Sequence, residues 1–165
     1  MSIDRLEFAV ALAEKAGELG LDYFHKLDTL TITQKGHQDL VSEADRNVET
    51  LIRAELAKSY PDDGILGEEH GMEEGSSGYT WVTDPIDGTA NFVAGIPQWC
   101  VIISCVHQGQ VIVGVIHDPV VAIGGLTAGL LHQEGNRGAF IDQPQAPVVV
   151  SGPIISGIKK DPPAH

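Results

Sequence analysis

The segment Trp81-Val82-Thr83-Asp84-Pro85-Ile86-Asp87-Gly88-Thr89 constrains the fold and the chemistry of this chain more than any other. Its first three residues predict a strand, and the residues after Gly88 predict a short helical turn. Asp84 and Asp87 therefore fall where a strand ends and a helix begins, and the main-chain N–H groups of Gly88 and Thr89 can face an anion. Clustered carboxylates repel one another unless a proton or a cation lies between them. This arrangement favours a hard divalent metal such as Mg²⁺.

A second acidic pair, Glu68-Glu69, lies sixteen residues before Asp84. A site built from Asp and Glu oxygens, beside backbone groups suited to phosphate, makes metal-assisted phosphate chemistry the leading hypothesis. Turns are also rich in Asp for local hydrogen-bonding reasons, so Asp84 as a turn-capping residue is the alternative. Glu69 either supports the metal ligands or is simply solvated.

Other motifs for metals or phosphates do not fit. Counted as an EF-hand from Asp84, the position that needs a bidentate Glu is occupied by Gly95. Lys35-Gly36 lacks the surrounding Gly and Ser/Thr residues of a P-loop. A plain hairpin turn at Asp87-Gly88 remains an alternative, although a strand–loop–helix anion site fits the following residues better.

Composition bounds the class of protein. A chain of 165 residues with 42% hydrophobic residues is the size of one domain with a substantial core. The formal charge of −13 argues against direct nucleic-acid binding, which needs a Lys/Arg surface. Cys100 and Cys105 lie an odd number of residues apart on one expected strand, so they point to opposite faces and cannot bridge. No signal peptide or membrane span is evident, and we expect a cytoplasmic protein without a membrane partner.

Periodicity predicts two helices followed by strands. Residues 3–26 form an amphipathic pattern, residues 30–33 alternate as a strand, and Ser42 is positioned to cap a second helix that runs to about Ser59. A short strand is expected at Ile65-Leu66.

From Trp81 onward the chain is expected to be β-rich. Residues 99–107 and 111–117 predict a hairpin. Weaker strand candidates are residues 126–131, 138–141 and 148–150. We therefore predict an α+β fold in which two helices pack on a mostly antiparallel sheet, over residues 1–152, with a poorly ordered tail at 153–165.

Several separated motifs resemble those of inositol monophosphatases in order and spacing, over roughly residues 3–120. The resemblance implies that the chain is similar to the N-terminal half of that family's αβαβα sandwich. The family's C-terminal half, with its Trp-Asp-x-Ala-Ala-Gly motif, is absent from this sequence. The matching segments are Lys35, Asp39–Asp45, Ile65–Glu69, Trp81–Phe92, Gly95–Pro97 and Gly114–Pro119.

The resemblance implies a metal site. Glu68 and Asp84 would bind a first Mg²⁺, which the main-chain carbonyl of Ile86 completes. Asp84 would bridge to a second Mg²⁺ that Asp87 also holds. Because a further carboxylate of the second site belongs to the family's other half, this chain is expected to bind that metal weakly.

The resemblance also implies catalytic and substrate-binding roles. Thr89, paired with Asp45, would orient and deprotonate the attacking water, and Glu68 is counted with them as catalytic. The alternative is that Asp45 supports a helix start after Ser42. The implied substrate-binding residues are Gly88, Thr89, Asp87 and Lys35.

These expectations describe a Mg²⁺-dependent phosphomonoesterase that acts on a small polyol or sugar phosphate and is inactive or weakly active as this short chain. The alternatives are a non-catalytic family fragment that works through protein contacts, and a related histidinol-phosphate or nucleotide phosphatase. An apolar sheet face left without its second half favours a homodimer that buries residues of the 99–117 hairpin.

Overall fold

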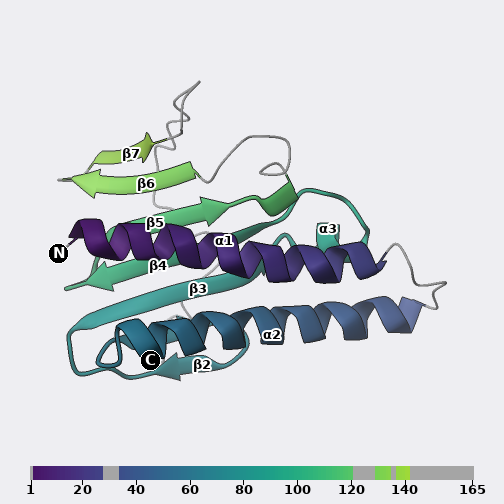
Figure 1. Cartoon of the computed structure of the whole chain (residues 1–165), viewed down its shortest axis with the longest axis horizontal. Helices are drawn as coiled ribbons and strands as arrows, with labels where there is room; N and C mark the ends of the chain where they lie inside the picture. The colour runs from purple at the N-terminus through teal and green to yellow at the C-terminus, as the bar shows by residue number, and fades with distance from the viewer. Residues whose placement is uncertain (1, 28–33, 121–128, 135–136, 142–165) are drawn as a thin grey trace, which may run out of the picture.

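The computed structural model describes residues 2–27, 34–120, 129–134 and 137–141, with side chains for residues 4–27 and 41–120. Two long helices, α1 (Ser2–Leu27) and α2 (Gln34–Ser59), lie side by side on one face of a sheet (Figure 1). A third, short helix, α3 (Thr89–Val93), follows the longest strand. This arrangement is the α+β architecture that the sequence predicts.

The described residues form a seven-stranded sheet in the order β2-β1-β3-β4-β5-β6-β7. Among these strands, only the neighbours β1 and β3 run parallel; every other neighbouring pair is antiparallel, so the sheet is mostly antiparallel as expected. The strands are β1 (Gly64–Gly67), β2 (Gly71–Glu73), β3 (Tyr79–Asp87), β4 (Cys100–His107), β5 (Gln110–His117), β6 (Gly129–Glu134) and β7 (Arg137–Ile141).

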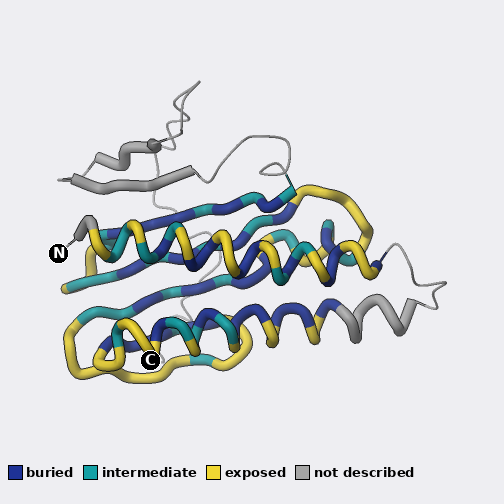
Figure 2. The backbone as a smooth tube through the Cα atoms, in the orientation of Figure 1, coloured by how far each residue is buried: buried dark blue, intermediate teal, exposed yellow. Residues whose placement is uncertain are grey.

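The core lies between the two long helices and the sheet, where the buried faces of both layers meet (Figure 2). Buried residues recur on each helix at spacings of three and four, which places them on one stripe. On β4 and β5, alternate residues face this layer and are buried almost completely. The core includes Ala9, Leu12, Ala13 and Ala16 of α1, Val48, Ile52 and Leu56 of α2, and Trp81, Val101, Ile103, Cys105, Val113 and Val115 of the sheet.

Most of the predicted elements are confirmed. The first helix, the short strand β1, the helical turn α3 and the hairpin of β4 and β5 occur at the expected positions. The two weaker strand candidates around 126–131 and 138–141 correspond to β6 and β7. The predicted strand at 30–33, the candidate at 148–150 and the tail at 153–165 lie outside the described residues.

The predicted start of the second helix is wrong. α2 begins at Gln34 and not at Ser42, which lies exposed within the helix. Gln, Lys and Leu before Ser42 are good helix formers, and an exposed Ser in a helix interior costs only about half a kcal/mol. The cap-like pattern at Ser42 was therefore too weak a signal to mark a boundary.

Two smaller expectations concern the cysteines and the membrane. Cys100 and Cys105 are both free thiols, Cys105 in the core and Cys100 half-buried, as their odd spacing predicts. In the described part of the chain, no helix is long and apolar enough to cross a bilayer.

Candidate active site: a carboxylate cluster where β1 and β3 end

Parallel pairing of β1 and β3 brings the two acidic motifs together. The register aligns Gly67 with Thr83 in the last paired position. Glu68 follows the last residue of β1, and Asp84 is the next residue of β3, so the two carboxylates lie beside each other where the parallel pairing ends. A single strand pairing therefore brings together in space two acidic motifs that are far apart in the sequence.

A β-bulge places Asp84 and Asp87 on one face. Asp84 pairs with Ile102 and Asp87 with Cys100, so the segment from Asp84 to Asp87 contains one residue more than its partner on β4. In a regular strand, residues three apart point to opposite faces, and the extra residue restores them to the same face. Pro85 suits this position because it has no main-chain N–H to leave unpaired.

Carboxylates from α2, the β1–β2 turn and β3 disturb one another's ionisation. Burial, followed by the charges of Glu69, Glu68 and Asp84, raises the pKa of Asp45 to about 7. Burial, followed by the charges of Glu68 and Asp87, raises the pKa of Asp84 to about 7. The structure therefore gathers Asp45, Glu68, Asp84 and Asp87 into one electrostatic cluster, which we call the carboxylate cluster.

The carboxylate cluster has the donor chemistry that Mg²⁺ prefers. It offers hard oxygen ligands and a negative potential that a cation would neutralise. The Oδ1 atom of Asp84 is buried without a hydrogen-bond partner, so it remains available to a ligand. Among the described residues, no three His, Cys, Asp or Glu side chains stand close enough together to enclose a metal ion. The residues thus fit the ion by the chemistry of their donor atoms.

The turn between β3 and α3 shapes the region expected to bind phosphate. Gly88 has φ 95°, a left-handed conformation that side chains rarely adopt, and a Cβ there would lie 3.0 Å from the carbonyl oxygen of Gln98. The carbonyl of Gly88 accepts the N–H groups of Asn91 and Phe92, at 2.9 and 3.0 Å. Glycine is therefore required at this turn.

Aromatic packing fixes α3 against the rest of the domain. The ring of Phe92 contacts those of Phe24 and Trp99, with centroids 5.2 and 4.9 Å apart. These contacts connect the short helix to α1 and to the start of β4, so α3 is held by its neighbours despite its length.

Thr89 and Lys35 are two expected site residues that are not part of the carboxylate cluster. The Thr89 hydroxyl donates to the carbonyl oxygen of Ile86 at 3.0 Å, which places the expected nucleophile-activating group beside an expected metal ligand. The hydrogen bond between Thr89 and Asp45 that the resemblance implies stays a prediction. Lys35 lies in the first turn of α2, and its side chain lies outside the described part of the structure.

Sequence reasoning missed Glu49, which is fully buried one helical turn after Asp45. Burial alone would raise its pKa, but hydrogen bonds from Arg53 and from the main chain of Glu69 and His70 outweigh burial and lower it. A signal was present in the sequence, because Glu49 adjoins Val48 on the buried stripe of α2. A charged residue at a core-facing position indicates a specific partner.

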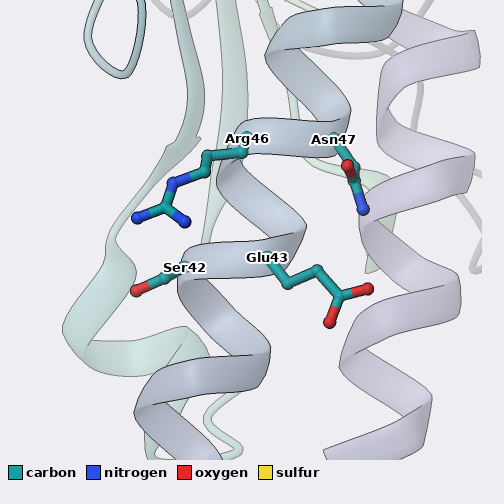
Figure 3. A pocket seen from close by; sticks show the side chains of 4 residues that line it. All are labelled: Ser42, Glu43, Arg46 and Asn47. Atoms are coloured by element: carbon teal, nitrogen blue, oxygen red, sulfur yellow. The ribbon is translucent and has the colours of Figure 1, made fainter.

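An open hollow of about 480 Å³ lies on α2, lined by Ser42, Glu43, Arg46 and Asn47. Figure 3 shows Ser42 and Arg46 extending to one side of the helix, and Glu43 and Asn47 extending toward the neighbouring helix. The guanidinium of Arg46 lies 3.9 Å from the carboxylate of Glu69. The hollow therefore adjoins the turn that carries Glu68.

Comparison with known proteins agrees with the motifs. The model of the inositol monophosphatase family matches residues 4–159. The chain is 42% identical to the histidinol-phosphatase of Chlorobaculum parvum over 88% of this chain and 53% of that protein. It is 36% identical to the fructose-1,6-bisphosphatase/inositol-1-monophosphatase of Thermotoga maritima, over 85% of this chain and 51% of that protein.

The structural comparison gives the same answer. The extragenic suppressor protein suhB of Bartonella henselae superposes with a TM-score of 0.66 at 33% identity, over 85% of this chain and 52% of that chain. This chain spans about half the length of the curated relatives it matches. Because the family model covers most of the sequence and the fold agrees with it, the chain belongs to the inositol monophosphatase family.

Proposed function

We propose that this chain carries the principal metal-binding half of a Mg²⁺-dependent phosphomonoesterase that hydrolyses a small polyol or sugar phosphate. The observation that carries the proposal is the parallel register of β1 and β3, which sets Glu68 beside Asp84 next to the buried Asp45. Membership of a phosphatase family supports the reaction type. The substrate class is proposed, and so is the activity of this chain, which spans about half the length of its relatives.

Each residue of the carboxylate cluster has a proposed role. Glu68, Asp84 and Asp87, with the carbonyl of Ile86, would hold the metal. When bound, Mg²⁺ would lower the pKa of water and neutralise charge on phosphate. Asp45 is a buried carboxylate whose pKa near 7 suits a general base at neutral pH.

The phosphate end of the site would be formed by the chain after β3. The main-chain N–H groups of Gly88 and Thr89 would bind phosphate oxygens, with Asp87 and Lys35 as further substrate-binding residues. Thr89 would orient the attacking water through its hydroxyl, in cooperation with Asp45.

A histidinol phosphate is the second candidate substrate. The observation in its favour is the 42% identity to the Chlorobaculum parvum histidinol-phosphatase, which extends over 88% of this chain. Both candidates are phosphomonoesters of small alcohols, so the same metal and phosphate groups would serve either reaction.

The test is phosphate release from inositol 1-phosphate and from histidinol phosphate, with and without Mg²⁺. We would assay this chain and a version extended by the C-terminal half of the Thermotoga maritima relative, each beside its Asp84→Asn variant. We expect little activity from the short chain and Mg²⁺-dependent activity from the extended one. Asp84→Asn should abolish the activity of each. Activity that survives Asp84→Asn, or an extended chain that folds and releases no phosphate, would contradict the proposal.

We further propose that the short chain forms a homodimer in the cytoplasm. Strand alternation places Val82, Ile102, Val106 and Ile116 on the sheet face opposite α1 and α2, where all four remain half-buried. A second copy that covers this face would bury apolar side chains that the long helices do not reach.

A further inference from the structure

The carboxylate of Glu49 reaches from α2 to the turn between β1 and β2. Its Oε2 atom accepts the main-chain N–H of Glu69 at 2.7 Å, and its Oε1 atom accepts that of His70 at 3.2 Å. The Nδ1 atom of His70 lies 3.2 Å from the same Oε1 atom. A fully buried side chain thus satisfies two main-chain donors directly after Glu68.

Arg53 fixes the carboxylate of Glu49 from the next turn of α2. Its Nε atom donates to Oε1 of Glu49 at 2.8 Å, and its guanidinium also donates to the carbonyl of Gly71. A further ion pair joins it to Glu73 at 3.4 Å. Since Gly71 and Glu73 belong to β2, Glu49 and Arg53 together hold both sides of the turn.

The close approach of α2 to β1 depends on Gly67. A Cβ atom at this residue would lie 2.0 Å from Oε1 and 2.3 Å from Cδ of Glu49, far inside any normal contact. Gly67 is the last residue of β1 and immediately precedes Glu68. The absence of a side chain there allows Glu49 to contact the turn.

We propose that Glu49 is a positioning residue of the cation site. By gripping the main chain of Glu69 and His70, it fixes the direction in which Glu68 leaves β1 and sets that carboxylate beside Asp84. Residues that contact the metal ligands, and not the ion itself, orient those ligands and affect the affinity for the metal. This inference rests on the proposed function, because it assigns the turn to the binding of Mg²⁺.

Glu49→Gln is the informative substitution because it keeps the shape of the side chain while it removes the negative charge and replaces one acceptor oxygen by an NH₂ donor. The side chain of Glu49 faces N–H donors on both oxygens, from Glu69 on Oε2 and from Arg53 and His70 on Oε1. A glutamine amide can accept on one side only, so its NH₂ group must face a donor in either orientation. Glu55→Gln is the matched control, since Glu55 lies on the same helix and pairs with Lys15 and Lys58 away from the turn.

Two measurements test the proposal on the 165-residue chain. Calorimetry with Mg²⁺ should show an affinity about 10- to 100-fold weaker in Glu49→Gln and unchanged in Glu55→Gln. Hydrogen exchange followed by NMR, without metal, should show the amides of Glu69 and His70 exchanging about tenfold faster in Glu49→Gln alone. The second readout reports the contact itself, independently of any activity.

The outcomes separate this inference from the function on which it rests. A wild-type chain that binds neither Mg²⁺ nor Mn²⁺ would overturn the proposed function, and Glu49 would then be purely structural. A wild-type chain that binds Mg²⁺, with equal affinity in Glu49→Gln, would overturn this inference alone. If Glu49→Gln does not fold, the wild-type amides of Glu69 and His70 decide: exchange as fast as in an unstructured peptide would refute the contact.

Discussion

Arg5, near the start of α1, and Asp63, just before β1, form a partly buried ion pair that connects the first helix to the sheet. The guanidinium of Arg5 also lies over the rings of Tyr60 and Tyr79, at 4.2 and 4.0 Å from their centroids. Asp63 in turn accepts hydrogen bonds from the Ser77 hydroxyl at 2.6 Å and from the Trp81 indole N–H at 2.8 Å. Both carboxylate oxygens of Asp63 therefore accept hydrogen bonds from more than one donor.

The Asp63 network should make stability depend on pH. Burial alone would raise the pKa of Asp63, but hydrogen bonds from Arg5, Ser77 and Trp81 outweigh it and lower the pKa below its ordinary value. The stability that this shift supplies is present above the unfolded pKa and is lost as the pH falls through the folded pKa. Urea unfolding should show that Asp63→Asn lowers the free energy of unfolding by about 3 kcal/mol at neutral pH. As the pH falls into the acid range, the variant should lose less stability than the wild type does.

Asp62→Asn is the control for this prediction, because Asp62 is the exposed neighbour in the same turn. It should change stability by no more than about 0.5 kcal/mol. An Asp63→Asn variant as stable as Asp62→Asn would show that the ion pair contributes nothing to folding.

Asp84→Asn should stabilise the metal-free chain while it abolishes metal binding. A carboxyl whose pKa is raised in the fold destabilises the protein when ionised, and burial and the charges of Glu68 and Asp87 raise this pKa to about 7. After allowance for screening by solvent, we expect a gain of about 1–2 kcal/mol at neutral pH. Thermal unfolding with and without Mg²⁺ is the measurement. Mg²⁺ should raise the melting temperature of the wild type only, and equal stabilisation of both would exclude Asp84 as a ligand.

Gly67→Ala should reproduce the effect of disrupting Glu49. The added methyl group would lie 2.0 Å from Oε1 of Glu49, and the carboxylate cannot move without losing hydrogen bonds to Arg53 and Glu69. We expect a loss of about 2–3 kcal/mol in urea unfolding. In a Glu49→Ala background, which removes the obstruction, the same substitution should cost under about 1 kcal/mol. Additive losses would mean that Gly67 acts independently of Glu49.

Ile116→Glu should dissociate the proposed homodimer. Ile116 pairs with Ile102 on the sheet face opposite the long helices, so a carboxylate there would have to be buried at the interface. Ile96→Glu provides the control, because Ile96 is 44% exposed in the loop before β4. Sedimentation velocity should give a dimer for the wild type and Ile96→Glu, and a monomer for Ile116→Glu. A monomeric wild type at high concentration would refute the dimer.

Elements that depend on local signals could be predicted from the sequence. Three such signals each lie within a short stretch of sequence. They are the apolar stripe of α1, the alternation of buried and half-buried residues on β4 and β5, and the Gln108-Gly109 turn between these strands. The parallel pairing of β1 with β3 could not be predicted, because β1 has four residues and shows no alternation that would set a register. The acidic composition of the two motifs suggests that Glu68 and Asp84 share a site, the family resemblance implies their roles as ligands, and the register supplies the physical cause of their proximity.

The residues of the carboxylate cluster were identified from the sequence, but the groups that hold them were not. Pro85 indicates an irregular strand, yet only the pairing with β4 shows that a bulge reverses the direction of Asp87. Glu49 adjoins the buried stripe of α2, but its spacing from Arg53 is that of an ordinary solvent-exposed helix pair, so the sequence does not show which groups it contacts. The burial of both side chains depends on the distance between α2 and the β1–β2 turn, a property of the assembled fold.

The contact of Phe24 with Phe92 and Trp99 has a consequence for synthesis on the ribosome. At about 5–20 residues per second, Trp99 is made roughly 4–15 s after Phe24. During that interval the apolar stripe of α1 lacks the strands β4 and β5 on which it packs in the finished domain. α2 is the next element in the chain and can cover one side of α1, but the stripe of α1 that faces the sheet stays uncovered for seconds. We therefore expect the nascent chain to depend on chaperones more than a protein whose first helix packs only on its neighbours in the sequence.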